Sequence, residues 1–223
     1  MPGTGETIVI YPQAIRILHS LLALSMLAQL AVGELMDVPG AAGEPEEARL
    51  GIVPAAYAHA GHADVIVPVT AGFEAHECLG LVIAGLLLAR LLLAFSSLPE
   101  TGWRNLFPWL SASGRAALLA EAGAQAGGWM RGRLAPPEEG ETVARSVHGL
   151  MLLTALGIAA AGVVLFFGWN EHGHQTALIE AVGEVHETLV GLFEALLAAH
   201  ILAVILHQMQ GHNILTRIRP GKA

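Results

Sequence analysis

Two histidines in an apolar stretch near the C-terminus have the spacing of ligands that share one helix face. Residues 186–200 read HETLVGLFEALLAAH, with His186 and His200 at the two ends, fourteen residues apart. At about 100° per residue this interval falls only about 40° short of four full turns, and it spans roughly 21 Å along the axis. Imidazole nitrogen is a common metal ligand. One helix can therefore present two separate metal ligands at two depths.

Two further histidines match these depths on other apolar stretches. His19, in RILHSLLAL, comes about one turn into the first stretch, and His76, in FEAHECLG, opens the second. If successive stretches cross a membrane in opposite directions, His19 lies level with His200, and His76 lies level with His186. We therefore expect two cross-helix pairs, one stacked above the other.

Composition predicts that the elements carrying these histidines are membrane-spanning helices. The chain has 223 residues, of which 54% are hydrophobic and only 13% are charged, whereas a soluble domain has about 25% charged residues. Only helices and closed barrels satisfy their backbones in lipid, and no block alternates as a barrel strand does. We predict an all-α membrane protein, a four-helix bundle that forms a single domain over residues 1–223. Four apolar blocks reach the roughly 20 residues that a crossing needs, over residues 14–35, 76–95, 147–167 and 185–207.

The distribution of basic residues orients the predicted bundle. The first connection, residues 36–75, contains Arg49 alone of the eleven Lys and Arg residues, and the second, residues 96–146, contains five of the arginines. By the positive-inside rule, both termini and the loop 96–146 are cytoplasmic, and residues 36–75 form an outer loop. The first block has no clean cleavage site, so we expect it to remain as a helix. This predicts a multi-pass membrane protein.

Within the cytoplasmic loop, GRAALLAEAGAQAGGWMRGRL has two interpretations. One is a helix on the membrane surface, with Leu118, Leu119, Trp129 and Met130 toward lipid and the arginines at the head groups. The other is an irregular loop, which the several glycines favour.

Cysteine content and charge exclude several classes of protein. The lone cysteine, Cys78, cannot form an intrachain disulfide and excludes the covalent attachment motif of a c-type haem. The net charge of −8 gives no reason to expect nucleic acid as a partner.

Paired neutral imidazoles facing each other across a bundle suit haem iron, which takes two axial nitrogens. The macrocycle supplies apolar bulk, and the iron satisfies nitrogens that hydrocarbon would leave unpaired. Two histidines alone lack the further ligands that zinc prefers. A single membrane histidine can instead hydrogen-bond a neighbouring helix, but four histidines matched in depth favour two haem b groups. Small residues near the sites leave room for a flat ring: Gly80, Gly191, Ala198 and Ala199.

The chain resembles the prokaryotic cytochrome b561 family, which includes the b-type cytochrome subunits of nickel–iron hydrogenases. The matching pieces are RILHSLLALSMLAQLAVG, AHECLGLVIAGLLLARLLLAF and HETLVGLFEALLAAHILAVILHQMQGHNILTRI. The resemblance implies that His19, His76, His186 and His200 ligate two b haems and that the bundle exchanges electrons with quinone. The outer loop, residues 36–75, is longer than we expect in that family.

Other polar residues lie near the predicted haems. His148, in ARSVHGLMLL, opens the third block and has no partner in the pairing scheme. With Arg145 it lines a pocket for ubiquinone or menaquinone, or it meets a haem propionate or the membrane interface. Arg16, Arg90 and Arg145 are candidates to bind the propionates of the inner haem.

Three functions remain open on the sequence alone. The first is transmembrane electron transfer between a periplasmic redox partner, such as a c-type cytochrome, and membrane quinone, within a complex or oligomer. The second is a superoxide oxidase, an activity known in the family, although the acidic outer loops would repel that anion. The third is binding of a metal ion by outer histidines, namely His59, His62, His172 and His174. No residue is assigned a catalytic role.

Overall fold

The computed structural model describes residues 11–41, 66–96, 102–132 and 141–220. Its main elements are four long helices: α1 (Gln13–Leu35), α3 (Ala71–Ala94), α6 (Glu141–Gly168) and α7 (Ala177–Met209). All four are long and apolar enough to cross a membrane. The predicted all-α fold with four spanning helices is confirmed.

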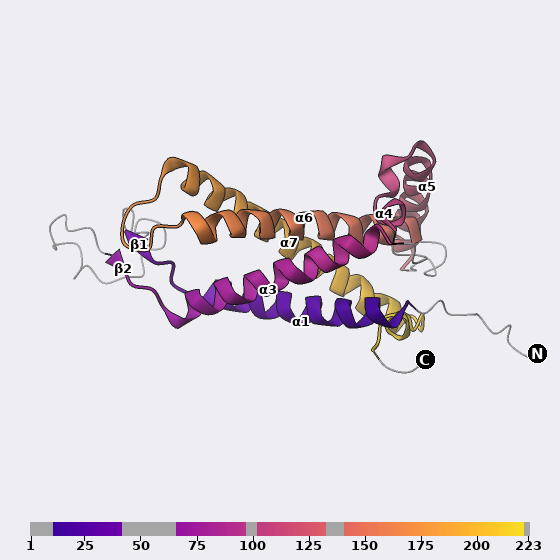
Figure 1. Ribbon diagram of the computed structural model, residues 1–223. Coiled ribbons are helices and arrows are strands. Elements are labelled where there is room, and N and C mark those ends of the chain that lie inside the picture. Colours follow the sequence, from indigo (N-terminus) through magenta and orange to yellow (C-terminus); the bar gives the residue numbers. More distant parts are fainter. Residues whose placement is uncertain (1–10, 42–65, 97–101, 133–140, 221–223) are drawn as a thin grey trace, which may run out of the picture.

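The four helices run lengthwise beside one another, as Figure 1 shows. α1 packs against α3, α3 against α6, and α6 against α7. Within the described part of the chain, α1 and α7 pack against these neighbours rather than against each other. Both described ends of the chain lie at one end of the bundle, which we call the inner end, and the opposite end is the outer end.

Three of the spanning helices begin before their apolar blocks, at residues 71, 141 and 177 rather than 76, 147 and 185. Thr70 caps α3 by accepting a hydrogen bond from the Phe73 amide, and Thr176 caps α7 by accepting one from the Ile179 amide. Hydropathy detects only the part of a helix that suits lipid, so the capped polar turns were assigned to loops.

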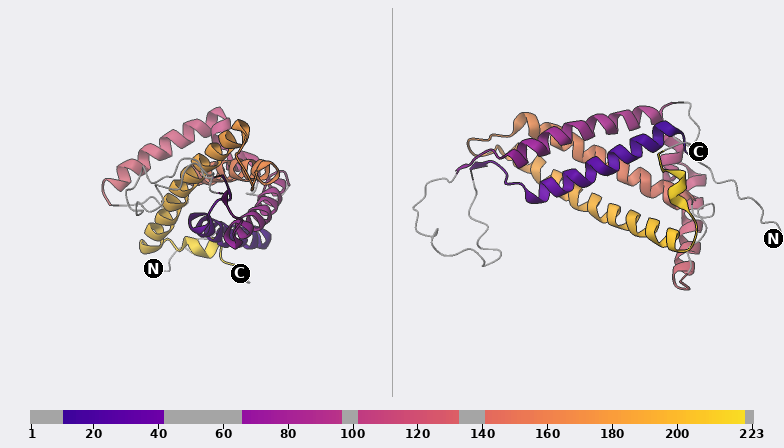
Figure 2. Two further views of the ribbon diagram at one scale, coloured as in Figure 1. Left: turned by 90° about the vertical axis from the view of Figure 1, so that its left-hand side faces the viewer. Right: turned by 90° about the horizontal axis from the view of Figure 1, so that it is seen from below.

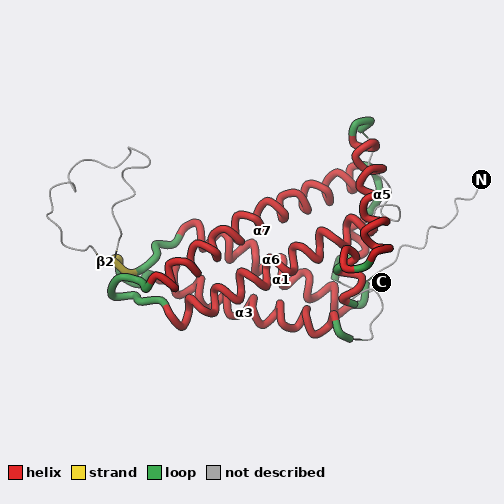
Figure 3. The backbone as a smooth tube through the Cα atoms, turned by 90° about the horizontal axis from the view of Figure 1, so that it is seen from above, coloured by secondary structure: helices red, strands yellow, loops and turns green. Residues whose placement is uncertain are grey.

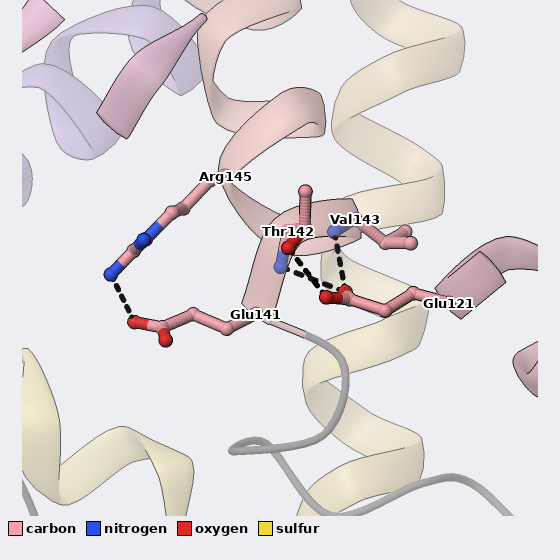
Figure 4. Close-up of polar contacts among 5 residues, drawn as sticks. All are labelled: Glu121, Glu141, Thr142, Val143 and Arg145. Atoms are coloured by element: carbon pink, nitrogen blue, oxygen red, sulfur yellow. Dashed lines mark hydrogen bonds and ion pairs between the residues drawn. The ribbon is translucent and has the colours of Figure 1, made fainter. Parts of the chain in front are cut away.

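α6 begins against a carboxylate supplied by another helix (Figure 4). Glu121 lies on α5 (Ala112–Trp129) and accepts hydrogen bonds from the amides of Thr142 and Val143, at 2.8 and 3.2 Å. It also accepts one from the Thr142 hydroxyl at 2.5 Å. The first amides of a helix have no partner within the helix, and its positive end favours an anion. Glu121 therefore fixes α5 to the inner end of α6.

The inner end also holds α4 (Trp103–Leu106) and the 3-10 turn η2 (Pro108–Leu110). α5 lies across the ends of the spanning helices, as Figures 2 and 3 show. The interpretation of this segment as a helix is confirmed, and the irregular loop is wrong. Gly149 lets α4 approach α6, because a Cβ there would collide with the carbonyl oxygen of Leu106.

The buried apolar core lies between α3, α6 and α7 and reaches α4. Elsewhere the spanning helices expose large apolar side chains, and α7 buries only Ile179 and Phe193. Such apolar outer surfaces suit contact with lipid tails. The core consists of Ile83, Leu87, Ala94, Leu106, Leu152, Ala155 and Phe193.

At the outer end, the two described ends of the outer loop pair with each other. β1 (Gly40–Ala41) lies antiparallel to β2 (Ile66–Val67). The Trp169 indole donates a hydrogen bond to the Pro39 carbonyl at 2.8 Å. The base of this loop is thereby attached to the connection between α6 and α7.

The C-terminal tail crosses from the end of α7 to the start of α1 (Figure 2). The 3-10 turn η3 (Ile214–Arg217) is followed by Arg219, whose carbonyl accepts a hydrogen bond from Arg16 at 2.9 Å. The Tyr11 amide donates to the Arg217 carbonyl at 3.2 Å. These bonds hold the two ends of the described chain together at the inner end.

Candidate metal centres

His76 on α3 and His186 on α7 face each other near the outer end. Their ring centroids lie 6.5 Å apart, with the ring planes at 68°. Metal–imidazole bonds are about 2.0–2.1 Å long, so two rings on opposite sides of one metal have centroids roughly 6 Å apart. The predicted outer pair is brought together at a spacing that suits one metal between the rings.

Each of these rings lies against a glycine of a neighbouring helix. A Cβ at Gly33 on α1 would lie 3.3 Å from Cε1 of His76, and a Cβ at Gly162 on α6 would lie 3.3 Å from Cε1 of His186. In both cases Nδ1 is the next nearest ring atom, and it is buried without a hydrogen-bond partner among the described residues. Neither glycine was predicted from the sequence. Gly80, which was, packs against Gln29 instead.

A fourteen-residue interval relates two levels of the bundle on all four spanning helices. Because fourteen residues make about four turns, the two members on each helix share one face. The outer layer consists of Gly33, His76, Gly162 and His186. The inner layer consists of His19, Arg90, His148 and His200.

The inner layer contains three histidines. His19 lies within electrostatic range of His200. His148 has its ring centroid 5.2 Å from that of His200, with the ring planes at 67°. It also lies within electrostatic range of His19 and Arg90. The inner level therefore holds one more imidazole than the sequence pairing assigned to it.

The three arginines predicted to bind carboxylates differ in their contacts. Arg16 is only 7% exposed, and its Nε has no hydrogen-bond partner among the described residues. Arg90 likewise has a buried Nη1 that lacks a partner within the described chain. Arg145 instead forms an ion pair with Glu141 at 2.5 Å. Because buried N–H groups are costly when unpaired, Arg16 and Arg90 are the two that suit a bound anion.

The remaining histidines do not form a further centre. His172 and His174 are exposed in the connection between α6 and α7. No group of three or more metal-ligating side chains occurs in residues 11–41, 66–96, 102–132 and 141–220. His59 and His62, the other candidates for an outer metal ion, lie outside the described residues.

The paired imidazoles and the buried arginines fit haem groups. Two facing histidines would supply both nitrogen ligands of one iron, and the guanidinium N–H groups of Arg16 and Arg90 would suit the propionates of a haem at the inner level. A sequence model of prokaryotic cytochrome b561 matches residues 10–221. The chain belongs to the prokaryotic cytochrome b561 family. Searches of curated proteins and of solved structures returned no match.

Membership of the b561 family makes this chain a multi-pass bacterial membrane protein that binds b-type haem and transfers electrons within the membrane. The iron of such a haem alternates between ferric and ferrous states and so carries one electron at a time. The resemblance inferred from the histidine-bearing segments is confirmed. What the residues of the chain contribute is ligation, orientation and charge around the iron.

Gly162→Val is expected to weaken haem binding at the outer level. The added side chain would push the His186 ring, and overpacking of this kind costs about 1–3 kcal/mol, or roughly five- to 150-fold in affinity. Haem retained after dilution, measured by absorbance, tests this. Gly123→Val on α5 is the control, because a Cβ there meets no described atom within 4 Å and α5 lies outside the spanning helices. Equal haem retention in the two variants would contradict the role of Gly162.

Proposed function

We propose that this b561-family protein transfers electrons through two haems between a periplasmic redox partner and membrane quinone. His76 and His186 ligate the outer haem, and His19 and His200 ligate the inner one. The observation that carries the proposal is the facing outer pair at 6.5 Å, with the inner layer fourteen residues away on every helix. At about 1.5 Å per residue, this interval corresponds to about 21 Å and supports two haem sites at different depths of the bilayer.

The inner haem is oriented by the two arginines that have buried, unpaired N–H groups. Arg16 and Arg90 each offer a nitrogen that lacks a partner among the described residues. Propionates are the anionic groups of haem, and hydrogen bonds from guanidinium to carboxylate are strong. Arg16 and Arg90 would therefore hold the propionates of a haem at the inner level.

The inner end faces the cytoplasm, and the membrane is the bacterial inner membrane. The arginines of the described cytoplasmic segments and of the tail lie at this end, which agrees with the positive-inside rule. Those outside the spanning helices are Arg104, Arg115, Arg131, Arg217 and Arg219. Ubiquinone or menaquinone reacts beside the inner layer. His148 lies at that level, whereas Arg145, once paired with it in the sequence analysis, is held by Glu141.

The outer end suits a basic redox partner such as a c-type cytochrome. Glu77 lies next to His76 and within electrostatic range of Glu171 and Glu74. A negative surface beside the outer haem attracts a positively charged protein and speeds its association. The same surface repels superoxide, so a superoxide oxidase is the second candidate only by family analogy.

Spectroscopy of the purified protein in nanodiscs tests the proposal. We expect a b-type reduced-minus-oxidised spectrum, about two haems per chain, and rapid reoxidation of the reduced protein by a soluble quinone analogue. The control offers superoxide to the oxidised protein as an electron donor, and reduction of the haem by superoxide should be slow. Colourless protein that binds Zn²⁺ would support the metal-ion alternative and overturn the proposal. Haem that the quinone analogue cannot oxidise would exclude quinone as a redox partner in the proposal.

A further inference from the structure

The two layers are built on the same interval but differ in composition. On α1, α3, α6 and α7 in turn, the outer layer presents glycine, histidine, glycine and histidine, and the inner layer presents histidine, arginine, histidine and histidine. An iron between two axial ligands uses two imidazoles. The outer level supplies that number, and the inner level supplies one more.

The additional imidazole is that of His148, and its ring lies close to the ring of His200. The centroid separation of 5.2 Å compares with 6.5 Å for the outer pair, and the interplanar angles, 67° and 68°, are alike. The separation for one metal between two rings is roughly 6 Å, given metal–nitrogen bonds of about 2 Å. A displacement of the His148 ring by about 1 Å would bring the two rings to this separation.

A change in the His148 side-chain rotamer would supply such a displacement. The next residue, Gly149, is buried where α4 contacts α6. This contact holds the backbone in place, and the His148 side chain can still change rotamer. By contrast, the outer rings of His76 and His186 each lie against a glycine.

We propose that His148 is a reserve axial ligand of the inner haem, able to replace His19 opposite His200. The inference rests on the proposed ligation of the inner haem by His19 and His200 and assigns His148 a role toward the iron rather than toward quinone. It predicts that the inner site tolerates loss of one ligand, while the outer site does not.

The test compares haem content and spin state in three variants purified in nanodiscs. His19→Ala should keep about two haems per chain, both low-spin in the electron paramagnetic resonance spectrum, with altered g values for the inner haem. His19→Ala combined with His148→Ala should lose the inner haem. His76→Ala is the matched control and should lose the outer haem, because glycines occupy the other positions of its layer.

Three outcomes would overturn the reserve-ligand proposal. One is His19→Ala protein with about one haem, and another is an inner haem that becomes five-coordinate and high-spin in that variant. The third is protein with both His19→Ala and His148→Ala that keeps about two low-spin haems, which would show that His148 is not the replacing ligand. Failure of the proposed function looks different, because both His186→Ala and His200→Ala would then keep the full haem content.

Discussion

A His186→Ala chain is expected to bind about half as much haem as the parent chain. His186 faces His76 at 6.5 Å, and the other two members of the outer layer are glycines that supply no ligand. Loss of one imidazole leaves the outer iron with a single protein ligand, whereas the inner layer is unchanged. Haem per chain, measured as the pyridine haemochrome against protein concentration, gives the result directly.

The matched control for this variant is His172→Ala, which removes an exposed histidine from the connection between α6 and α7. It should retain the full haem content and an unchanged spectrum. Retention of the full content by His186→Ala, with both haems still low-spin, would show that His186 is not a ligand. Loss of both haems together with loss of the folded protein would be recognised by size-exclusion chromatography, and His186→Leu would then test ligation with a side chain that keeps its bulk but cannot bind iron.

Arg90→Gln is expected to lower the midpoint potential of the inner haem by about 60–130 mV. The Arg90 guanidinium lies within electrostatic range of His148, and its buried Nη1 lacks a partner among the described residues. A cation near the haem stabilises the more negative ferrous state, so its removal favours the ferric state. A hydrogen bond to a charged group is worth about 1.5–3 kcal/mol, and about 1.4 kcal/mol corresponds to 59 mV for a one-electron couple.

A redox titration followed at the haem absorption bands measures this shift. Arg145→Gln is the control of equal charge change on the same side of the membrane, and its effect should be small because Arg145 is already paired with Glu141. Equal shifts in the two variants would indicate a general surface-charge effect. A shift confined to the outer haem would show that Arg90 lies beside that haem and not beside the inner one.

The spanning helices and the histidine levels could be predicted because both depend on local rules. The length of an apolar block and the 3.6-residue period are visible in any single segment. His186 and His200 share a helix, and their partners followed from the alternating direction of successive spans. The same period could have found Gly33 and Gly162, which lie fourteen residues after His19 and His148. They were missed because glycine carries no group that suggests chemistry.

Features that depend on tertiary contacts could not be predicted. Glu121 lies twenty-one residues before Thr142, and no sequence rule links a carboxylate to a helix start at that distance. Similarly, the pairing of His148 with His200 follows from the packing of α6 against α7. The histidines were paired from the sequence by their depth alone. Depth does not decide whether the imidazole of His19 or that of His148 lies nearer to His200.

The shared interval also limits how the length of this bundle can vary. Adding one residue to a helix between the two layers would turn one of its members about 100° away and shift it by about 1.5 Å. Insertions and deletions are therefore compatible with both sites only beyond the layers, in the capped turns and loops. Related chains should differ in length at their extremities while the stretch between the paired positions keeps a constant number of residues.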